Sequence, residues 1–209
     1  MFFYVKEKIR TFFSAILLLV LIFSFSSCST PPPELETVKE EYIALVEESA
    51  EINGFIFGEG LPVYKRDGSE EEKLVYQNLV SSLDNYESVR DDSKYLTIEA
   101  MKEAAKEVYS EEYLKSAFQM AFEGFADEVA GVSAARYLEW DGWLYQSMHY
   151  EPIIEETRTY NYSTMEIVKP SNGEYVNVSI ESELKGEKET IILAFSLTEN
   201  GWRLDTPTY

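Results

Sequence analysis

Apolar residues recur at helical spacing through the first part of the chain, which predicts a series of amphipathic helices. The first helix is predicted over residues 34–52, followed by a loop over residues 54–68, which hold four glycines and a proline. A second helix is predicted after Ser69, because residues 69–72 match a capping box. The positions predicted to face inward are Leu35, Val38, Tyr42, Leu45, Val46 and Ile52 on the first helix, and Leu74, Val75, Leu79, Val80 and Leu83 on the second. Residues 85–94 are polar and are predicted to be irregular.

Two further helices are predicted from their caps, Thr97 and Ser110. The residues that flank each cap are spaced as hydrophobic staples, Leu96 with Met101 and Tyr109 with Leu114. The predicted core faces are Ile98, Met101, Ala105 and Val108 on the first of these helices, and Leu114, Phe118, Ala121, Phe122 and Phe125 on the second.

From Ala135 onward the period changes to two, which is typical of strands. Three hairpins are predicted, with turns at Asp141-Gly142, Asn172-Gly173 and Asn200-Gly201. The predicted cross-strand pairs are Trp140 with Trp143, Leu138 with Tyr145, Ile167 with Val178, Met165 with Ile180, and Leu197 with Leu204. N-terminal helices followed by a curved antiparallel meander predict an α+β fold, with the helices packed on one face of the sheet.

Three segments carry a resemblance to known families: residues 108–114 (VYSEEYL), 137–145 (YLEWDGWLY) and 199–205 (ENGWRLD). The order of elements resembles the NTF2-like and cystatin-like group, in which a curved sheet wraps around a helix. Over residues 95–205 the same segments resemble Firmicute envelope proteins related to the D,L-endopeptidase inhibitor family. Such proteins bind cell-wall hydrolases and block their active sites, so the resemblance implies a hydrolase partner. No inhibitory residue can be carried over by position.

The N-terminus has the features of a secretory signal: a short basic segment, an apolar run over residues 11–25 and two small residues before Cys28. The apolar run is too short for a comfortable membrane span. Residues 25–28 (FSSC) resemble the lipobox of bacterial lipoproteins, whose Cys is lipidated, although that family usually has Leu where Phe25 stands. The alternative is an ordinary secretory signal followed by an unmodified Cys. The resemblance implies a signal peptide over residues 1–27, a lipid anchor and Pro-rich tether over 28–33, and a single domain over 34–209 on the extracellular face of the cell membrane.

The charge and the scarcity of certain residues exclude several functions. The chain holds 38 acidic and 18 basic side chains, a net charge of −20, which disfavours nucleic-acid binding. One Cys and one His exclude a disulfide framework and a multi-His metal centre, and no cofactor is predicted. His149 follows a predicted strand, where a surface histidine is usual, and no catalytic motif is present, so an enzyme is not expected.

The chain is rich in tyrosine, with 15 copies. Tyr is favoured at binding surfaces because it combines a large contact area with a polar tip. By alternation Tyr137 and Glu139 oppose the face of Leu138 and Trp140, and Tyr160 and Tyr162 oppose the face of Met165 and Ile167. The predicted partner-binding residues are therefore Tyr137, Glu139, Tyr160 and Tyr162. The alternative is that these aromatics line a half-buried sheet.

Three functions remain open. The first is a non-catalytic, membrane-anchored lipoprotein that binds an envelope protein partner through the exposed aromatic and acidic side of the sheet. The second is a small-ligand binder with a pocket between sheet and helices, and the third is an enzyme that uses the same pocket. A large cavity with convergent polar groups would favour the pocket, whereas a filled core with exposed aromatics would favour the partner.

Overall fold

The computed structural model describes residues 30–65, 68–79, 85–124, 135–154 and 156–209, with no side-chain detail for residues 75–79. All the elements below belong to one compact unit, Pro32–Tyr209. The predicted signal peptide and the predicted lipidation site, Cys28, lie outside the described residues. The elements in order are α2 (Leu35–Ile56), α3 (Glu70–Leu79), β1 (Tyr86–Ser88), α4 (Ile98–Val108), α5 (Glu111–Phe118), the π-helical turn η1 (Gln119–Glu123), β2 (Tyr137–Trp140), β3 (Trp143–Ser147), β4 (Thr159–Val168), β5 (Tyr175–Leu184), β6 (Glu187–Thr198) and β7 (Gly201–Leu204).

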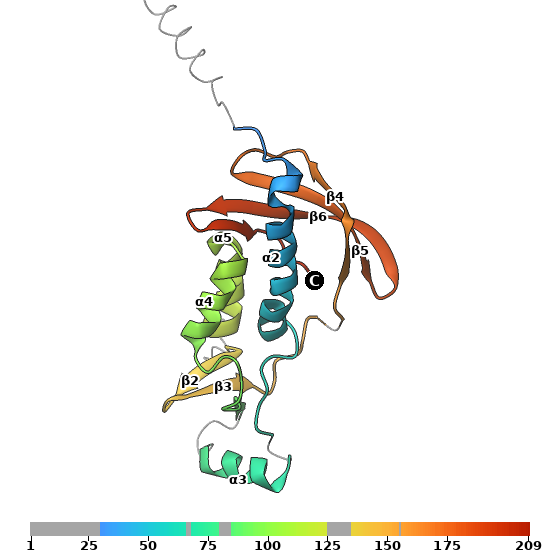
Figure 1. Cartoon of the computed structure of the whole chain (residues 1–209). Coiled ribbons are helices and arrows are strands. Elements are labelled where there is room, and N and C mark those ends of the chain that lie inside the picture. Colours follow the sequence, from blue (N-terminus) through green and yellow to red (C-terminus); the bar gives the residue numbers. More distant parts are fainter. Residues whose placement is uncertain (1–29, 66–67, 80–84, 125–134, 155) are drawn as a thin grey trace, which may run out of the picture. The chain divides into compact units, whose positions relative to one another are not determined.

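The α+β class is confirmed, and the strands divide into two antiparallel sheets. The larger sheet has the order β4-β5-β6-β7, and α2 runs alongside α4 and packs against β4 and β7 (Figure 1). The smaller sheet has the order β1-β3-β2, so the first predicted hairpin pairs with β1 rather than with the C-terminal meander. β1 lies in a segment predicted to be irregular, and its pairing with β3 explains why so short and polar a segment is extended.

The first helix is longer than predicted, because α2 continues through Gly54 to Ile56. Its predicted inward face is confirmed for Val38, Tyr42, Leu45, Val46 and Ile52, which are buried in the core, whereas Leu35 is only partly buried. The buried Arg136 donates from Nη1 to the carbonyl oxygen of Ile56 at 2.7 Å, and from Nη2 to that of Gly58. The guanidinium gives these carbonyl oxygens, at and just after the C-terminal end of α2, a hydrogen-bond donor. Its positive charge also interacts favourably with the negative end of the helix dipole.

All three predicted helix caps form. Ser69 and Glu72 make the reciprocal capping box, with Ser69 N 2.7 Å from Glu72 Oε2 and Glu72 N 3.2 Å from Ser69 Oγ. Thr97 accepts from Ala100 N at 3.1 Å, and Ser110 accepts from Tyr113 N at 3.2 Å.

The apolar residues predicted to pair across these caps are not all buried. Tyr109 and Leu114 are both buried, whereas Leu96 is 47% exposed although Met101 is buried. Leu74 is 61% exposed, so its predicted inward position is wrong: α3 packs mainly against the three-residue strand β1, which is too short to cover it. The side chains of Val75, Leu79, Val80, Leu83 and Phe125 lie outside the described part of the chain.

The register of the first hairpin is confirmed, with Trp140 opposite Trp143 and Leu138 opposite Tyr145. In the second hairpin Ile167 pairs with Val178 as predicted. The predicted pair of Met165 with Ile180 is not formed, because the register shifts between Asn161 and Glu166.

The third hairpin turns one residue earlier than predicted. Thr198 pairs with Gly201, so Glu199 and Asn200 form the two-residue loop. Thr198 Oγ1 accepts from Asn200 N at 3.2 Å and donates to Gly201 O at 2.8 Å, which closes the turn at that position. Leu197 consequently faces Trp202, and the predicted pair of Leu197 with Leu204 is wrong.

Candidate functional site

Two of the four predicted partner-binding residues have structural roles. Tyr137 is fully buried and donates to Phe55 O at 2.9 Å, so the prediction that its side chain faces away from the core is wrong. Glu139 is exposed, but its Oε1 accepts from Ile98 N at 2.6 Å and so caps the first turn of α4. Both residues belong to the smaller sheet, so the four predicted residues do not form one surface.

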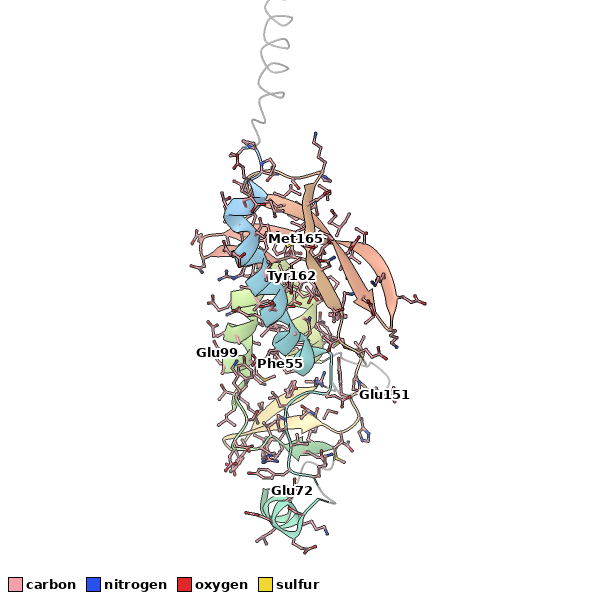
Figure 2. All side chains as sticks on the ribbon, turned by 45° about the vertical axis from the view of Figure 1, so that its right-hand side comes forward. Phe55, Glu72, Glu99, Glu151, Tyr162 and Met165 are labelled. Atoms are coloured by element: carbon pink, nitrogen blue, oxygen red, sulfur yellow. The ribbon has the colours of Figure 1, made fainter. Side chains whose placement is uncertain are left out.

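A β-bulge changes the orientation of the other two. Between Asn161 and Glu166 the strand holds extra residues, and Thr164 Oγ1 accepts from Glu181 N at 2.9 Å in place of a backbone carbonyl. A bulge interrupts the alternation of side chains along a strand. Tyr160 and Tyr162 therefore pack against the same core as the buried Met165 and line a cleft together with residues of α2. Figure 2 labels Tyr162 and Met165 on this part of the molecule. The prediction that they face away from the core is wrong.

These tyrosines line an open cleft of about 580 Å³. One wall is α2 from Val46 to Gly54 with the residues that follow the helix, and the other is β4 with the segment that leads into it. Thr208 and Tyr209 complete the lining. The cleft thus lies between a helix and the edge strand of the larger sheet, within the size range of small-molecule sites.

The floor of the cleft is a buried polar network centred on Thr208. Its Oγ1 bonds to Ser49 Oγ, accepts from Asn53 Nδ2 at 2.8 Å and lies 3.2 Å from Tyr109 OH. Tyr109 OH also donates to Asn53 Oδ1 at 2.9 Å, and Tyr160 OH donates to Thr208 O. Burial raises the pKa of both Tyr109 and Tyr160, so both phenols remain protonated donors at neutral pH. Since these groups satisfy one another, the floor is rigid.

The helical wall is lined by small residues. Ala50 and Gly54 lie four residues apart on α2, Gly58 follows two residues after the helix ends, and a Cβ built on Gly54 would meet nothing within 4 Å. Gly within a helix is less stable than Ala by roughly 0.5–1 kcal/mol. Close packing therefore does not explain why residue 54 is Gly. The absence of a side chain at this position keeps this wall of the cleft open.

Acidic side chains dominate the rim. Glu47, Glu59 and Glu156 are exposed and line the cleft. Arg158 also lines it, but its Nη1 donates to Glu189 Oε1 and, at 2.8 Å, to Ser182 Oγ, so its charge is compensated on the sheet. Burial raises the pKa of Tyr162, and the nearby Glu47 carboxylate raises that pKa further.

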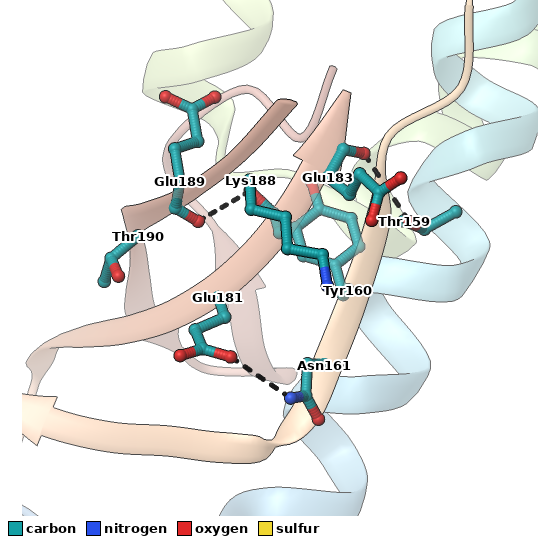
Figure 3. A pocket seen from close by; sticks show the side chains of 9 residues that line it. Thr159, Tyr160, Asn161, Glu181, Glu183, Lys188, Glu189 and Thr190 are labelled. Atoms are coloured by element: carbon teal, nitrogen blue, oxygen red, sulfur yellow. Dashed lines mark hydrogen bonds between the residues drawn. The ribbon is translucent and has the colours of Figure 1, made fainter. Parts of the chain in front are cut away.

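A second hollow of about 390 Å³ lies on the strands β4, β5 and β6 (Figure 3). Its side chains form two cross-strand rows, Thr159 with Glu183 and Lys188, and Asn161 with Glu181 and Thr190. Asn161 Nδ2 donates to Glu181 Oε2 at 3.3 Å. These exposed polar rows are typical of a solvated strand face, so the cleft beside α2 is the stronger candidate site.

Metal ligands and catalytic side chains were sought among the described residues. Among them, no group of three or more His, Cys, Asp or Glu side chains is arranged to hold a metal ion. His149 Nε2 lies 3.2 Å from Asn85 Oδ1, and His149 is not part of the cleft. Ser49 Oγ donates to Val46 O at 2.6 Å, so the hydroxyl in the floor is already engaged.

Sequence reasoning missed three features of this site: Glu47, Gly54 and Arg158. Gly54 was assigned to a loop because of the glycines that follow it. The small residues at positions 50 and 54, four apart and therefore on one face of a helix, are the signal that could have indicated this open wall.

None of the protein-family models, curated proteins or solved structures compared with this chain matches it. Within the residues that the structure describes, no helix has both the length and the apolar character needed to cross a membrane.

Proposed function

We propose that this chain is a non-catalytic binding protein, held at the outer face of the cell membrane by lipid on Cys28, and that the cleft between α2 and β4 is its ligand site. The observation that carries the proposal is the open cleft of about 580 Å³, bounded by partly exposed tyrosines and a rigid polar floor. Ligand sites are typically concave, largely preformed and provided with a few fixed polar groups. The cleft has each of these properties.

Binding is favoured over catalysis because the polar groups of the floor are committed to one another. The hydroxyl of Ser49 donates to the backbone of α2, and the amide of Asn53 is used on both its nitrogen and its oxygen. A nucleophile needs a base within hydrogen-bond reach, and Ser49 instead contacts a carbonyl oxygen and another hydroxyl.

The membrane anchor in this proposal depends on the lipobox-like sequence that ends at Cys28. Residues 31–33 are three consecutive prolines, which form extended, semi-rigid spacers, and α2 begins two residues after them. Such a tether would hold the domain close to the membrane surface.

The test is ligand retention by the full-length chain, extracted from membranes in dodecyl maltoside and analysed by native mass spectrometry. A Gly54→Leu variant fills the helical wall of the cleft, and Ala44→Leu adds the same side chain at an exposed position of α2 that does not line it. We expect a bound small molecule in the parent and in Ala44→Leu but not in Gly54→Leu, with all three proteins folded by circular dichroism. Equal retention by the two leucine variants would refute the cleft as the site.

A second candidate function, the protein partner implied by the family resemblance, is favoured by one separate feature. Trp140 is 57% exposed beside the Asp141-Gly142 turn, opposite the partly buried Trp143. Exposed Trp is a common anchor of protein interfaces. If this hairpin blocks a cell-wall hydrolase, the full-length chain should inhibit a purified D,L-endopeptidase, and Trp140→Ala should weaken inhibition at least tenfold. No inhibition by the parent would remove this candidate.

A further inference from the structure

The cleft beside α2 has a surplus of negative charge at its mouth. Three acidic side chains line it, Glu47 on α2, Glu59 after the helix and Glu156 before β4. Among the described residues that line the cleft, Arg158 is the single basic side chain, and it is paired with Glu189. A ligand in the cleft therefore meets carboxylates on both walls that no basic side chain of the described residues pairs with, within a chain whose net charge is −20.

Aromatic and small residues line the cleft next to these carboxylates. The rings of Tyr160 and Tyr162 are stacked, with centroids 6.1 Å apart and an interplanar angle of 14°. Glu47 on α2 and Tyr162 on β4 both line the cleft, and the Glu47 carboxylate contributes to the raised pKa of the Tyr162 phenol. On the helical side, the missing side chain at Gly54 leaves room for an aliphatic group. The face of a tyrosine ring attracts an ammonium group, and a carboxylate that lines the same cleft attracts it as well.

From this arrangement we infer that the ligand is an organic cation, an amine that places its charged group between Glu47 and Tyr162 and its apolar stem along Ala50 and Gly54. The inference depends on the proposed function, since it names the ligand class of that same cleft. An anionic ligand would face three like charges, which disfavours its binding. A neutral ligand would leave the carboxylates without a partner and so would gain nothing from them.

The same chemistry can come from a free amine or from a lysine side chain of a peptide. The two sources share the ammonium group and the aliphatic stem, and they differ in the amide groups that flank a lysine. A lysine blocked at both ends as amides therefore separates them from a simple alkylamine.

The experiment is calorimetric titration of the full-length chain in dodecyl maltoside at pH 7.5 with hexylamine, hexanol, hexanoate and the blocked lysine, each corrected for titration into empty micelles. We expect the two amines to bind and hexanoate not to bind. Tighter binding of hexylamine indicates a free amine as the natural ligand, and tighter binding of the blocked lysine indicates a peptide.

Matched variants test the role of Glu47. Glu47→Gln should weaken amine binding about tenfold, since a tenfold change corresponds to about 1.4 kcal/mol and charge-assisted hydrogen bonds are of that order. Glu48→Gln makes the same change of net charge on the same helix at an exposed residue that does not line the cleft, and should change the affinity less than twofold. Equal effects of the two variants would overturn the inference, because amine binding would then reflect net charge alone.

Two further outcomes overturn the inference and differ in what they say of the cleft. If hexanol or hexanoate binds as tightly as hexylamine and Gly54→Leu abolishes that binding, the cleft is a ligand site of another class and the proposed function stands. If none of the four probes binds, the cationic class is wrong, and the proposed function is judged by the retention experiment alone.

Discussion

Replacing Gly54 by Ala tests both the helical conformation of this residue and the empty space beside it. Gly54 lies inside α2, two residues before the helix ends at Ile56. A Cβ added there meets no atom within 4 Å, and the residue has no positive φ that would strain a side chain. The substitution therefore adds no clash to the folded state.

The expected gain follows from backbone entropy. Ala is more stable than Gly in a helix by roughly 0.5–1 kcal/mol, with the lower value more apt near a helix end. For a chain of 150–250 residues, about 1 kcal/mol shifts the melting temperature by roughly 2–4 °C. We expect Gly54→Ala to raise the melting temperature of the full-length chain by about 1–4 °C, measured by far-UV circular dichroism.

Gly58→Ala is the matched control. A Cβ at Gly58 would lie 3.0 Å from the carbonyl oxygen of Gly54 and 3.1 Å from its Cα, and neither backbone atom can move easily. This variant should therefore be destabilised, by roughly 1–3 kcal/mol. If Gly54→Ala lowered the melting temperature, or if both variants raised it, the helix would not continue through Gly54 as the structure has it.

Three further predictions concern buried groups. Tyr42→Phe should leave the free energy of unfolding unchanged or slightly raised, because the buried Tyr42 hydroxyl has no hydrogen-bond partner among the described residues. Tyr137→Phe should cost about 1 kcal/mol, because the Tyr137 hydroxyl donates to Phe55 O. Urea unfolding measures both variants, and equal losses would contradict the assignment. Arg136→Leu should lower the free energy of unfolding by roughly 2–4 kcal/mol in the same assay, because the carbonyl oxygens of Ile56 and Gly58 lose their hydrogen-bond donor. A loss under about 0.5 kcal/mol would refute that role. Burial raises the pKa of Tyr137 to about 12 in the folded protein, whereas a tyrosine in the unfolded chain has a pKa near 10. The protonated phenol therefore stabilises the folded state fully below about pH 10, and this stabilisation is lost as the pH rises through the folded-state pKa. In an absorbance titration at 295 nm we therefore expect exposed tyrosines to ionise near pH 10 and a later phase to accompany unfolding; a single reversible phase near pH 10 would contradict this.

Much of the local structure was predictable because its causes lie close together in the sequence. The caps at Ser69, Thr97 and Ser110 depend on residues no more than three positions away. The Asp141-Gly142 turn sets the register of its own hairpin, because two-residue loops select residues that adopt positive φ, and both residues do so here.

The errors arise where a distant segment decides the outcome. Met165 was expected opposite Ile180, but the bulge near Thr164 shifts the strand, and that bulge is held by a bond to Glu181 across the sheet. Alternation with Leu138 predicts Tyr137 on the surface, yet its side chain is buried in the core and donates a hydrogen bond to Phe55 O, in a helix more than 80 residues earlier.

The sequence by itself thus determined the α+β class, the helix starts and most strand positions, since periodicity and caps are local properties of the chain. Only the tertiary structure decided which strands share a sheet, which way Tyr160 and Tyr162 face, and that Glu47, Gly54 and Tyr162 border one cleft. The physical reason is that the cleft is made by the packing of α2 against an edge strand more than a hundred residues later. No pattern within either segment specifies the other, so their shared surface exists only after the chain has folded.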